Sequence, residues 1–384
     1  MWQHPQNHGK GPTNMPLLVL GAVVILLLLL ERYVYKRLWD KGLDYSIQFS
    51  AKEAFEGDTV YLREELVNKK TLPLPWVYAK MRTPQNLAFV DANNQRITKD
   101  DNFGSLYSIM SFTATRRKTK AICQKRGVYN IGNINISVSN LLHTQRFYKE
   151  QRAKNELLVF PKIFDDFDDI SLLYRHMDSV VLTNRIINPD PFEFKGIRDY
   201  QPSDPLKNIN FRASAISQTL MVNIHEPTCA QRMVLVLNLD EHEADPELYE
   251  QSIRLCATLA AHYIDMEVGV GFATNGKDSG TAQAMGLPVG SSSGHLYNIL
   301  ESLARIGLGF KCPPMTEYVS QLTDREQMYV FVSPYHGDDF MDAFRELEER
   351  GIAGFLVVPT LRGMDAGVLE SYNVAVWDAA PIKG

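Results

Sequence analysis

Alternating hydrophobic and polar positions are the main feature of the chain between residues 43 and 150. Leu43, Tyr45 and Ile47 alternate with polar residues, and this period of two predicts a strand with one apolar face. The same alternation returns further along this range, and no helical period competes with it. We therefore predict an all-β sandwich of the immunoglobulin-like type over residues 43–150.

The pattern changes after residue 156, where short apolar runs alternate with segments of helical period. The apolar runs that read as buried strands are Leu157–Phe160, Met233–Leu237, Val268–Phe272, Tyr329–Val332 and Gly354–Val358. Strands that alternate with helices are typical of a mostly parallel sheet covered on both faces. We predict a doubly wound α/β domain over residues 156–384.

Two helices of this second domain have clear start and stop signals. The first begins at Asp245 and Pro246, a plausible N-cap followed by a proline in the first turn, and it places Ile253 and Cys256 on one apolar face. The second runs from about Asp338 to Arg350 and is ended by a glycine. Neither helix carries a recognisable catalytic motif, and Cys256 reads as a core residue.

The N-terminal region contains the longest apolar run. Nearly every residue from Met15 to Leu30 is apolar, and as a helix this run would extend about 24 Å, compared with a hydrocarbon core of about 30 Å. Tyr33 and Tyr35 could extend the helix as interfacial residues. We interpret residues 15–35 as a membrane anchor; the alternative is a cleaved signal peptide, but no small-residue cleavage site follows the run.

Basic residues beside the apolar run indicate its orientation. Arg32, Lys36, Arg37 and Lys41 follow the run, whereas only Lys10 precedes it. Because basic flanks remain in the cytoplasm, we expect a single-pass protein of the cell membrane. Its N-terminal tail, residues 1–14, would lie outside the cytoplasm and its soluble domains inside.

Composition narrows the range of partners. The 384 residues include 40 basic and 45 acidic side chains, so no overall positive charge would recruit nucleic acid. The four cysteines lie far apart and signal neither a zinc site nor a set of disulfides. We expect no cofactor.

One segment, residues 195–215, is more specific than any short catalytic motif in the chain. Its spaced positions resemble the signature of a bacterial family known as domain of unknown function fifty-eight. The matching residues are Gly196, Arg198, Tyr200, Asp204, Ile209, Ser214 and Ala215. Ser203 stands where that family usually has glycine, and Phe211 where it usually has tryptophan. We call residues 195–215 the signature segment.

The resemblance extends over most of the chain and has implications for fold and partner. The stretch from Arg126 to Tyr129 is similar to the strand that closes the family's β domain. The resemblance implies a von Willebrand factor A-like α/β domain in a membrane protein, and a MoxR-type AAA+ ATPase as the protein partner. The family usually has two membrane helices, whereas this chain shows one.

A von Willebrand factor A domain that binds Mg²⁺ uses oxygen ligands at the end of its first strand and in two later loops. At the corresponding positions this chain has Asn238, Asp240 and His242, and later Ser333. Hard cations need several oxygen ligands, preferably carboxylates, and only Asp240 remains. We interpret these positions as a degenerate metal site that holds no metal.

Charged residues of the signature segment allow two interpretations. Arg198, Asp204 and Arg212 could form an ion-pair network that stabilises the segment, or they could form a binding site for a partner. The structural role is favoured, because charged residues at fixed places among aromatic ones more often stabilise a loop.

These observations favour a membrane-anchored, non-enzymatic interaction or adaptor protein that works with a MoxR-type ATPase in assembling or remodelling envelope complexes. No nucleophile with a base and no cofactor-binding turn stands out, so no catalytic residue is assigned. The alternative is a hydrolase-like enzyme with its site at the carboxyl ends of the α/β strands, around Asp240 and Ser333.

Overall fold

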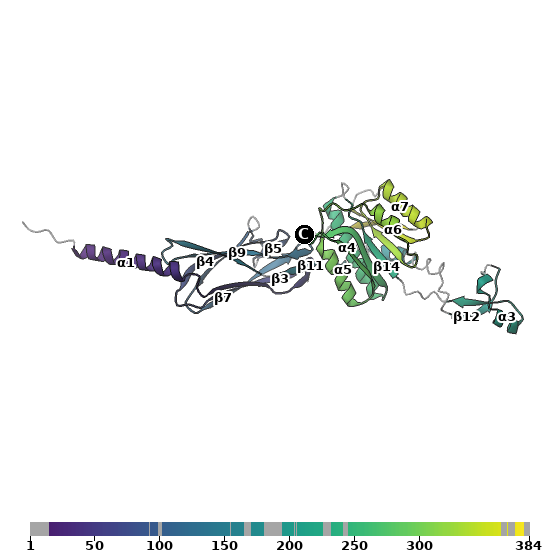
Figure 1. Ribbon diagram of the computed structural model, residues 1–384, viewed down its shortest axis with the longest axis horizontal. Coiled ribbons are helices and arrows are strands. Elements are labelled where there is room, and N and C mark those ends of the chain that lie inside the picture. Colours follow the sequence, from purple (N-terminus) through teal and green to yellow (C-terminus); the bar gives the residue numbers. More distant parts are fainter. Residues whose placement is uncertain are drawn as a thin grey trace, which may run out of the picture. The chain divides into compact units, whose positions relative to one another are not determined.

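The chain folds into two compact units, one of residues 1–159 and one of residues 160–384 (Figure 1). The structure is a computed structural model, and it describes residues 15–91, 93–98, 102–153, 155–164, 170–179, 194–202, 204, 206–225, 232–240, 245–361, 367 and 373–379. The tail of residues 1–14 lies outside this described part. Each unit is considered by itself below.

Helix α1, Met15–Leu38, begins the first unit. It has 24 residues, which correspond to about 36 Å at about 1.5 Å per residue. The span from Leu17 to Leu38 has a mean hydropathy of 2.4, and its apolar part is not buried inside the protein. Tyr35, near the end of the helix, packs in the core of the sandwich. The helix is therefore long and apolar enough to cross a membrane, as the sequence predicted, and it ends three residues beyond the predicted limit.

The β sandwich of the first unit consists of two four-stranded antiparallel sheets and a small three-stranded sheet. The strand order is β1-β3-β7-β5 in one large sheet, β10-β9-β4-β6 in the other, and β2-β11-β8 in the small one. The bounds are β1 Leu43–Phe49, β2 Glu53–Phe55, β3 Thr59–Asn68, β4 Leu74–Arg82, β5 Leu87–Val90, β6 Asn102–Ile109, β7 Ala114–Cys123, β8 Gly127–Tyr129, β9 Asn133–Ser139, β10 Arg146–Arg152 and β11 Leu157–Phe160. This confirms the predicted all-β architecture.

Strand β1 shows why the alternation predicts the sandwich. Leu43, Tyr45 and Ile47 are each 5% exposed or less, while the residues between them face solvent. Successive side chains of a strand point to opposite faces, so one face of β1 enters the core between the sheets. Gly57, at φ +94°, allows the turn that leads to β3.

One predicted domain boundary is wrong. Residues 157–159 were assigned to the α/β domain, but they belong to the first unit, where β11 pairs antiparallel with β8 and Leu157 lies opposite Tyr129. Leu157 and Val159 belong to the core of the sandwich. A short run of apolar residues looks the same whether it closes a sandwich or begins a parallel sheet, so the sequence alone did not distinguish these cases.

The second unit contains a mainly parallel sheet of strand order β16-β15-β14-β18-β19-β20, with the antiparallel strand β16 at one edge and β17 paired to β15. The strands are β14 Arg232–Leu237, β15 Gly269–Asp278, β16 Ala284–Gly290, β17 Ile306–Gly307, β18 Met328–Val332, β19 Ala353–Leu361 and β20 Val374–Ala379. The helices are α4 Pro246–Asp265, α5 Ser293–Arg305, α6 Met315–Gln321 and α7 Asp338–Glu349. Residues 170–179 are also helical.

Helices cover both faces of this sheet. Val234 and Val236 of β14 pack in one core with residues of α6 and α7. The residues between them point to the opposite face, where α4 contacts β14 and β15. Helix α4 begins as predicted, because the Asp245 side chain accepts a hydrogen bond from the Glu247 amide at 2.9 Å. The predicted α/β architecture is therefore correct.

A buried carboxylate lies inside the β sandwich. Glu64 is 1% exposed, and its two oxygens accept hydrogen bonds from the Tyr45 hydroxyl at 2.6 Å and from the Ser105 hydroxyl at 3.0 Å. Burial, together with the nearby Glu64 charge, raises the pKa of Tyr45 above its ordinary value, so this phenol remains a donor. The three residues link strands β1, β3 and β6 through the core.

Removal of this acceptor should destabilise the sandwich. In Glu64→Ala, two buried hydroxyl groups lose their acceptor, so we expect the free energy of unfolding to fall by about 2–4 kcal/mol. Differential scanning fluorimetry of the full chain in detergent micelles would show this as a lower unfolding temperature. The control is Glu65→Ala on the same strand, whose side chain pairs at the surface with Arg116. Equal shifts for both variants would contradict the assigned role of Glu64.

Candidate functional site

The signature segment forms a small antiparallel hairpin with a helical connection. Its elements are β12 Phe194–Asp199, the short 3₁₀ turn η1 Leu206–Asn208, α3 Phe211–Ser217 and β13 Met221–His225. Strand β12 pairs with β13, with Asp199 opposite Met221, and the Tyr200 amide donates to the Leu220 carbonyl at 2.8 Å. The spaced residues of the signature are thus brought onto one compact element.

Arg198 and Asp204 form the strongest polar contact of this hairpin. Both guanidinium nitrogens of Arg198 donate to the Asp204 carboxylate, at 2.7 and 2.6 Å. The same carboxylate accepts from the Gln201 amide at 2.8 Å. Such a bidentate pair fixes orientation as well as distance, so it closes the turn that leaves β12. The predicted structural role is supported for these two residues.

The pair also changes the titration of both groups. Hydrogen bonds from Arg198 and from the Gln201 amide hold the pKa of Asp204 below its ordinary value, and the pKa of Arg198 is raised. Because the folded-state pKa of Asp204 is lowered, its contribution to stability is fully present above the pKa of an unfolded aspartate, about 3.9. It is lost as the pH falls through the lowered value. The pair is therefore intact at neutral pH.

Asn210 and Ser214 organise the rest of the hairpin. Asn210 caps α3, since its side-chain oxygen accepts from the Ala213 amide at 2.9 Å, and its amide group donates to Asn223 on β13 at 2.7 Å. The Ser214 hydroxyl donates to the Asn210 carbonyl at 2.7 Å and accepts from the Met221 amide at 2.8 Å. Ser214 therefore ties α3 to the start of β13.

The remaining signature residues have different environments. Ile209 forms a bridge to Val222, and Gly196 lies at an irregularity in the β12–β13 register. Tyr200 is partly buried. The proposed three-membered ion-pair network is wrong in one member, because Arg212 is exposed on α3 and does not join the Arg198–Asp204 pair. Sequence spacing did not reveal that Arg212 would face solvent.

Large apolar side chains of this hairpin remain exposed, which the sequence analysis missed. Leu206, Phe211, Ile216 and Leu220 are 69%, 76%, 79% and 52% exposed. We call these four residues the apolar patch of the hairpin. A signal was available in the sequence, because Phe211 and Ile216 lie five positions apart and so fall outside the i, i+3, i+4 spacing of a buried helix face. Several large exposed apolar residues on one small element are a feature of interaction sites.

A second cluster of polar residues lies at the carboxyl end of β14. Asn238 and Ser333 are fully buried, Asp240 is 6% exposed, and the Asn238 amide donates to the Ser333 hydroxyl at 2.9 Å. The Asp240 amide donates to the Asn238 side-chain oxygen at 2.9 Å. The carboxyl ends of β14 and β18 thus bring together three of the four predicted positions. His242 lies outside the described residues.

Asn275 of β15 completes this cluster and was not identified from the sequence. Its side-chain amide donates to the Asp240 carboxylate at 2.6 Å, to Asn238 at 3.2 Å and to the Pro313 carbonyl at 3.0 Å. Its oxygen accepts from the Leu239 amide at 2.9 Å. Position in the sheet was the available signal, since Asn275 is a buried polar residue towards the end of the strand beside β14.

The hydrogen bonds of this cluster use oxygens that a cation would need as ligands. Both oxygens of Asp240 face the Met315 amide, at 3.2 and 3.1 Å, at the start of α6. Groups of three or more His, Cys, Asp or Glu side chains able to hold a metal do not occur within the described ranges. Among the described residues, the Asp240 carboxylate accepts from N–H donors, which would compete with Mg²⁺ for its oxygens.

Ser333 has little capacity to act as a nucleophile. Its hydroxyl donates to the Tyr335 carbonyl and accepts from Asn238, and its side chain is fully buried. A nucleophilic serine needs an adjacent base and an exposed oxygen. The hydroxyl thus serves to hold the end of β18.

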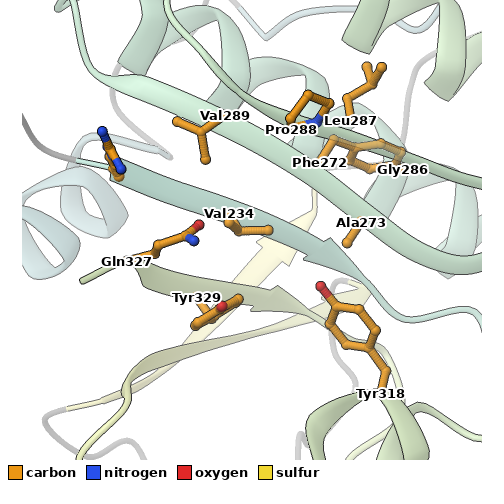
Figure 2. A pocket seen from close by; sticks show the side chains of 11 residues that line it. Val234, Phe272, Ala273, Gly286, Leu287, Pro288, Val289, Tyr318, Gln327 and Tyr329 are labelled. Atoms are coloured by element: carbon orange, nitrogen blue, oxygen red, sulfur yellow. The ribbon is translucent and has the colours of Figure 1, made fainter. Parts of the chain in front are cut away.

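An open hollow of about 480 Å³ lies on one face of the α/β sheet. Figure 2 shows Val234, Val289 and Tyr329 along its floor, with Tyr318 at one side. The hollow lies beside the core that α6 and α7 cover. Its lining includes residues of β14, β15, β16 and β18 and one residue of α6. Its lining is mainly apolar.

Comparison with known proteins identifies no family for this chain. No protein-family model matches it, and no curated protein matches it in sequence. Solved structures match part of it, and those described below are distant in sequence.

Three of these structures illustrate the extent of the likeness. Native alpha-2-macroglobulin from Escherichia coli, from domain MG7 to the C-terminus, is 12% identical over 31% of this chain and 23% of its own, with a TM-score of 0.24. A cohesin–dockerin complex from Clostridium thermocellum gives 12% identity over 31% of this chain and 96% of the matched chain, with a TM-score of 0.23. The CARDB domain of a Pyrococcus furiosus protein gives 10% identity over 32% of this chain and 97% of its own, with a TM-score of 0.21.

The Arg198–Asp204 pair can be tested by hydrogen–deuterium exchange of the full chain in detergent micelles. In Asp204→Asn the acceptor loses its charge, so we expect the amides of residues 196–202 to exchange several-fold faster. The control is Asp199→Asn, an exposed residue of the same hairpin. Unchanged exchange in Asp204→Asn would show that the pair does not stabilise the turn.

Loss of Asp240 should destabilise the second unit. Asp240→Ala leaves the buried Met315 amide without its acceptor and removes one of the acceptors of Asn275, and an unsatisfied buried group costs about 1–3 kcal/mol. We expect a lower unfolding temperature in thermal unfolding of the full chain in micelles. The surface variant Asp342→Ala should change it little, since that residue and its partner Arg345 are well exposed. A stabilisation by Mg²⁺ that Asp240→Ala abolished would instead show that the cluster binds the ion.

Proposed function

We propose that this chain is a membrane-anchored adaptor whose signature hairpin binds another protein. The observation that carries the proposal is the apolar patch of the hairpin. Its four large side chains are exposed, while the polar residues of the hairpin are hydrogen-bonded to one another. Polar contacts therefore stabilise the hairpin, and its apolar side chains remain available to bind another protein.

The proposed partner is a MoxR-type AAA+ ATPase. Support for it comes from the resemblance of residues 195–215 to the signature of domain of unknown function fifty-eight, including Gly196, Arg198, Tyr200 and Asp204. On this proposal the second unit is a von Willebrand factor A-like domain whose strand-end positions have become structural. The hydrogen bonds around Asp240 support that interpretation, because they occupy the carboxylate with N–H donors.

The proposed location is the cytoplasmic face of the cell membrane, with α1 as a single-pass anchor. The basic residues Arg32, Lys36, Arg37 and Lys41 follow the apolar run and support this orientation. Anchoring would hold the hairpin near envelope complexes that the ATPase assembles or remodels. The α/β unit acts in binding rather than in catalysis.

Binding can be tested with the full chain in detergent micelles and a purified MoxR-type ATPase from the same genome, with ATP and Mg²⁺. We expect Phe211→Asp and Ile216→Asp each to weaken binding at least tenfold, or about 1.4 kcal/mol, because each places a charge in an apolar contact. The control is Leu172→Asp, which charges an apolar residue of similar exposure, 73%, outside the hairpin.

The result separates the proposal from its competitors. Retention of the ATPase by the unaltered chain and by Leu172→Asp, but not by the hairpin variants, supports the proposal. Equal retention by all variants moves the binding surface away from the hairpin. No retention by the unaltered chain rejects this class of partner.

A further inference from the structure

The end of α1 is joined to the β sandwich by the carboxylate of Glu31. One oxygen of Glu31 accepts from the Leu141 amide at 3.0 Å, and the other accepts from the Asn140 side chain at 3.0 Å. Both donors belong to the loop between β9 and β10. The helix therefore makes a direct contact with a sandwich loop 109 residues further along the chain.

That loop is well ordered by its own hydrogen bonds. The side chain of Asn140 is fully buried; its oxygen accepts from the Gln145 amide at 2.9 Å and its amide donates to Thr144 at 2.8 Å. The His143 amide donates a hydrogen bond to the Asn140 carbonyl at 3.0 Å. Asn140 thus organises a closed loop and at the same time contacts α1.

The tip of this loop is apolar and exposed. Leu141 and Leu142 are 58% and 50% exposed. Glu31 directly follows Leu30, the last residue of the uncharged apolar run. The Leu141 amide therefore lies at the level of α1 where the apolar run ends, which for a spanning helix is the boundary between hydrocarbon and headgroups.

A second loop carries exposed apolar residues at the same end of the sandwich. Met110 and Phe112, between β6 and β7, are 68% and 66% exposed. The Phe112 amide donates to the Lys70 carbonyl at 3.2 Å, and the Lys70 ammonium donates to the Trp39 carbonyl, just after α1, at 2.9 Å. The β9–β10 loop thus contacts α1 itself, and the β6–β7 loop lies beside Lys70, which contacts the residue that follows α1.

The polar residues around these loops match the chemistry of a lipid headgroup layer. Arg32, Lys36 and Arg37 lie on the last turns of α1, and Arg146 follows the β9–β10 loop. Basic side chains beside apolar tips suit a surface that has phosphates above a hydrocarbon layer. Among the nearby acids, Glu31 is hydrogen-bonded to the loop and Asp44 pairs with Lys69 at 2.7 Å.

From these contacts we infer that the β sandwich sits directly on the bilayer, with the tips Leu141–Leu142 and Met110–Phe112 in the headgroup layer around α1. The inference rests on the proposed membrane anchor. Its occupant is lipid, rather than a protein partner, because the β9–β10 loop contacts α1 where the apolar run ends. The loop tips, together with α1, would then fix the orientation of the sandwich relative to the membrane.

Fluorescence of the full chain in phosphatidylcholine–phosphatidylglycerol vesicles tests this inference. Single sites are labelled with an environment-sensitive thiol dye in a Cys229→Ser, Cys312→Ser background, since Cys123 and Cys256 are buried. The test sites are Leu142→Cys and Phe112→Cys. The control is Phe55→Cys, an exposed apolar residue near the start of β3, at the opposite end of that strand from α1. A label at Ile25→Cys reports separately on the position of α1.

We expect the dyes at Leu142 and Phe112 to shift to shorter wavelength and to be quenched by lipids with a nitroxide near the headgroup, and the dye at Phe55 to remain aqueous. The dye at Ile25 should be quenched by a nitroxide deep in the acyl chain. An aqueous Leu142 dye beside a quenched Ile25 dye overturns the inference and leaves the anchor intact. A shifted but unquenched Leu142 dye overturns it in favour of a protein contact, and an unquenched Ile25 dye overturns the anchor as well.

Discussion

A carboxylate that leaves bulk water must accept hydrogen bonds, and several carboxylates of the described residues meet this requirement in ways that organise the fold. Glu31 joins α1 to a sandwich loop, Glu64 links strands across the core, Asp204 closes the turn of the hairpin, and Asp240 holds the ends of neighbouring strands in the second unit. Each accepts donors from a different element, so each fixes an arrangement that apolar packing alone would leave loose. Their partners are hydroxyls, amides and one guanidinium.

The need to hydrogen-bond a buried carboxylate also explains why the sequence at this strand end of the second unit resembles a metal site. Oxygen-bearing residues gather at the carboxyl ends of parallel strands, where cations and ligands commonly bind. In this chain the side-chain amide of Asn275 and the backbone amide of Met315 supply N–H donors to the Asp240 carboxylate. A cation and these donors would compete for the same oxygens, and here the donors hold them.

Local patterns predicted most of the fold because they follow from the geometry of one element. The period of two in β1 and the Asp245 cap of α4 depend only on neighbours in sequence, and both are found in the structure. Features that depend on a distant partner were missed. Residues 157–160 joined the sandwich because β8 and β2 were available to pair with them, and Asn275 entered the strand-end cluster through contacts with residues at least 35 positions away. Nothing local to these residues encodes such partners.

The signature segment is stabilised by contacts that are close in sequence, and its large apolar side chains take no part in them. The Arg198–Asp204 pair, the Asn210 cap and the Ser214 bridge all close within about 25 residues, so the hairpin is held without burying Phe211 or Ile216. Apolar side chains that a fold needs are normally buried in it, since burial is where their stabilisation comes from. Side chains that remain exposed on an element held by polar contacts contribute little to its folding. On the proposed function, a bound protein would cover them.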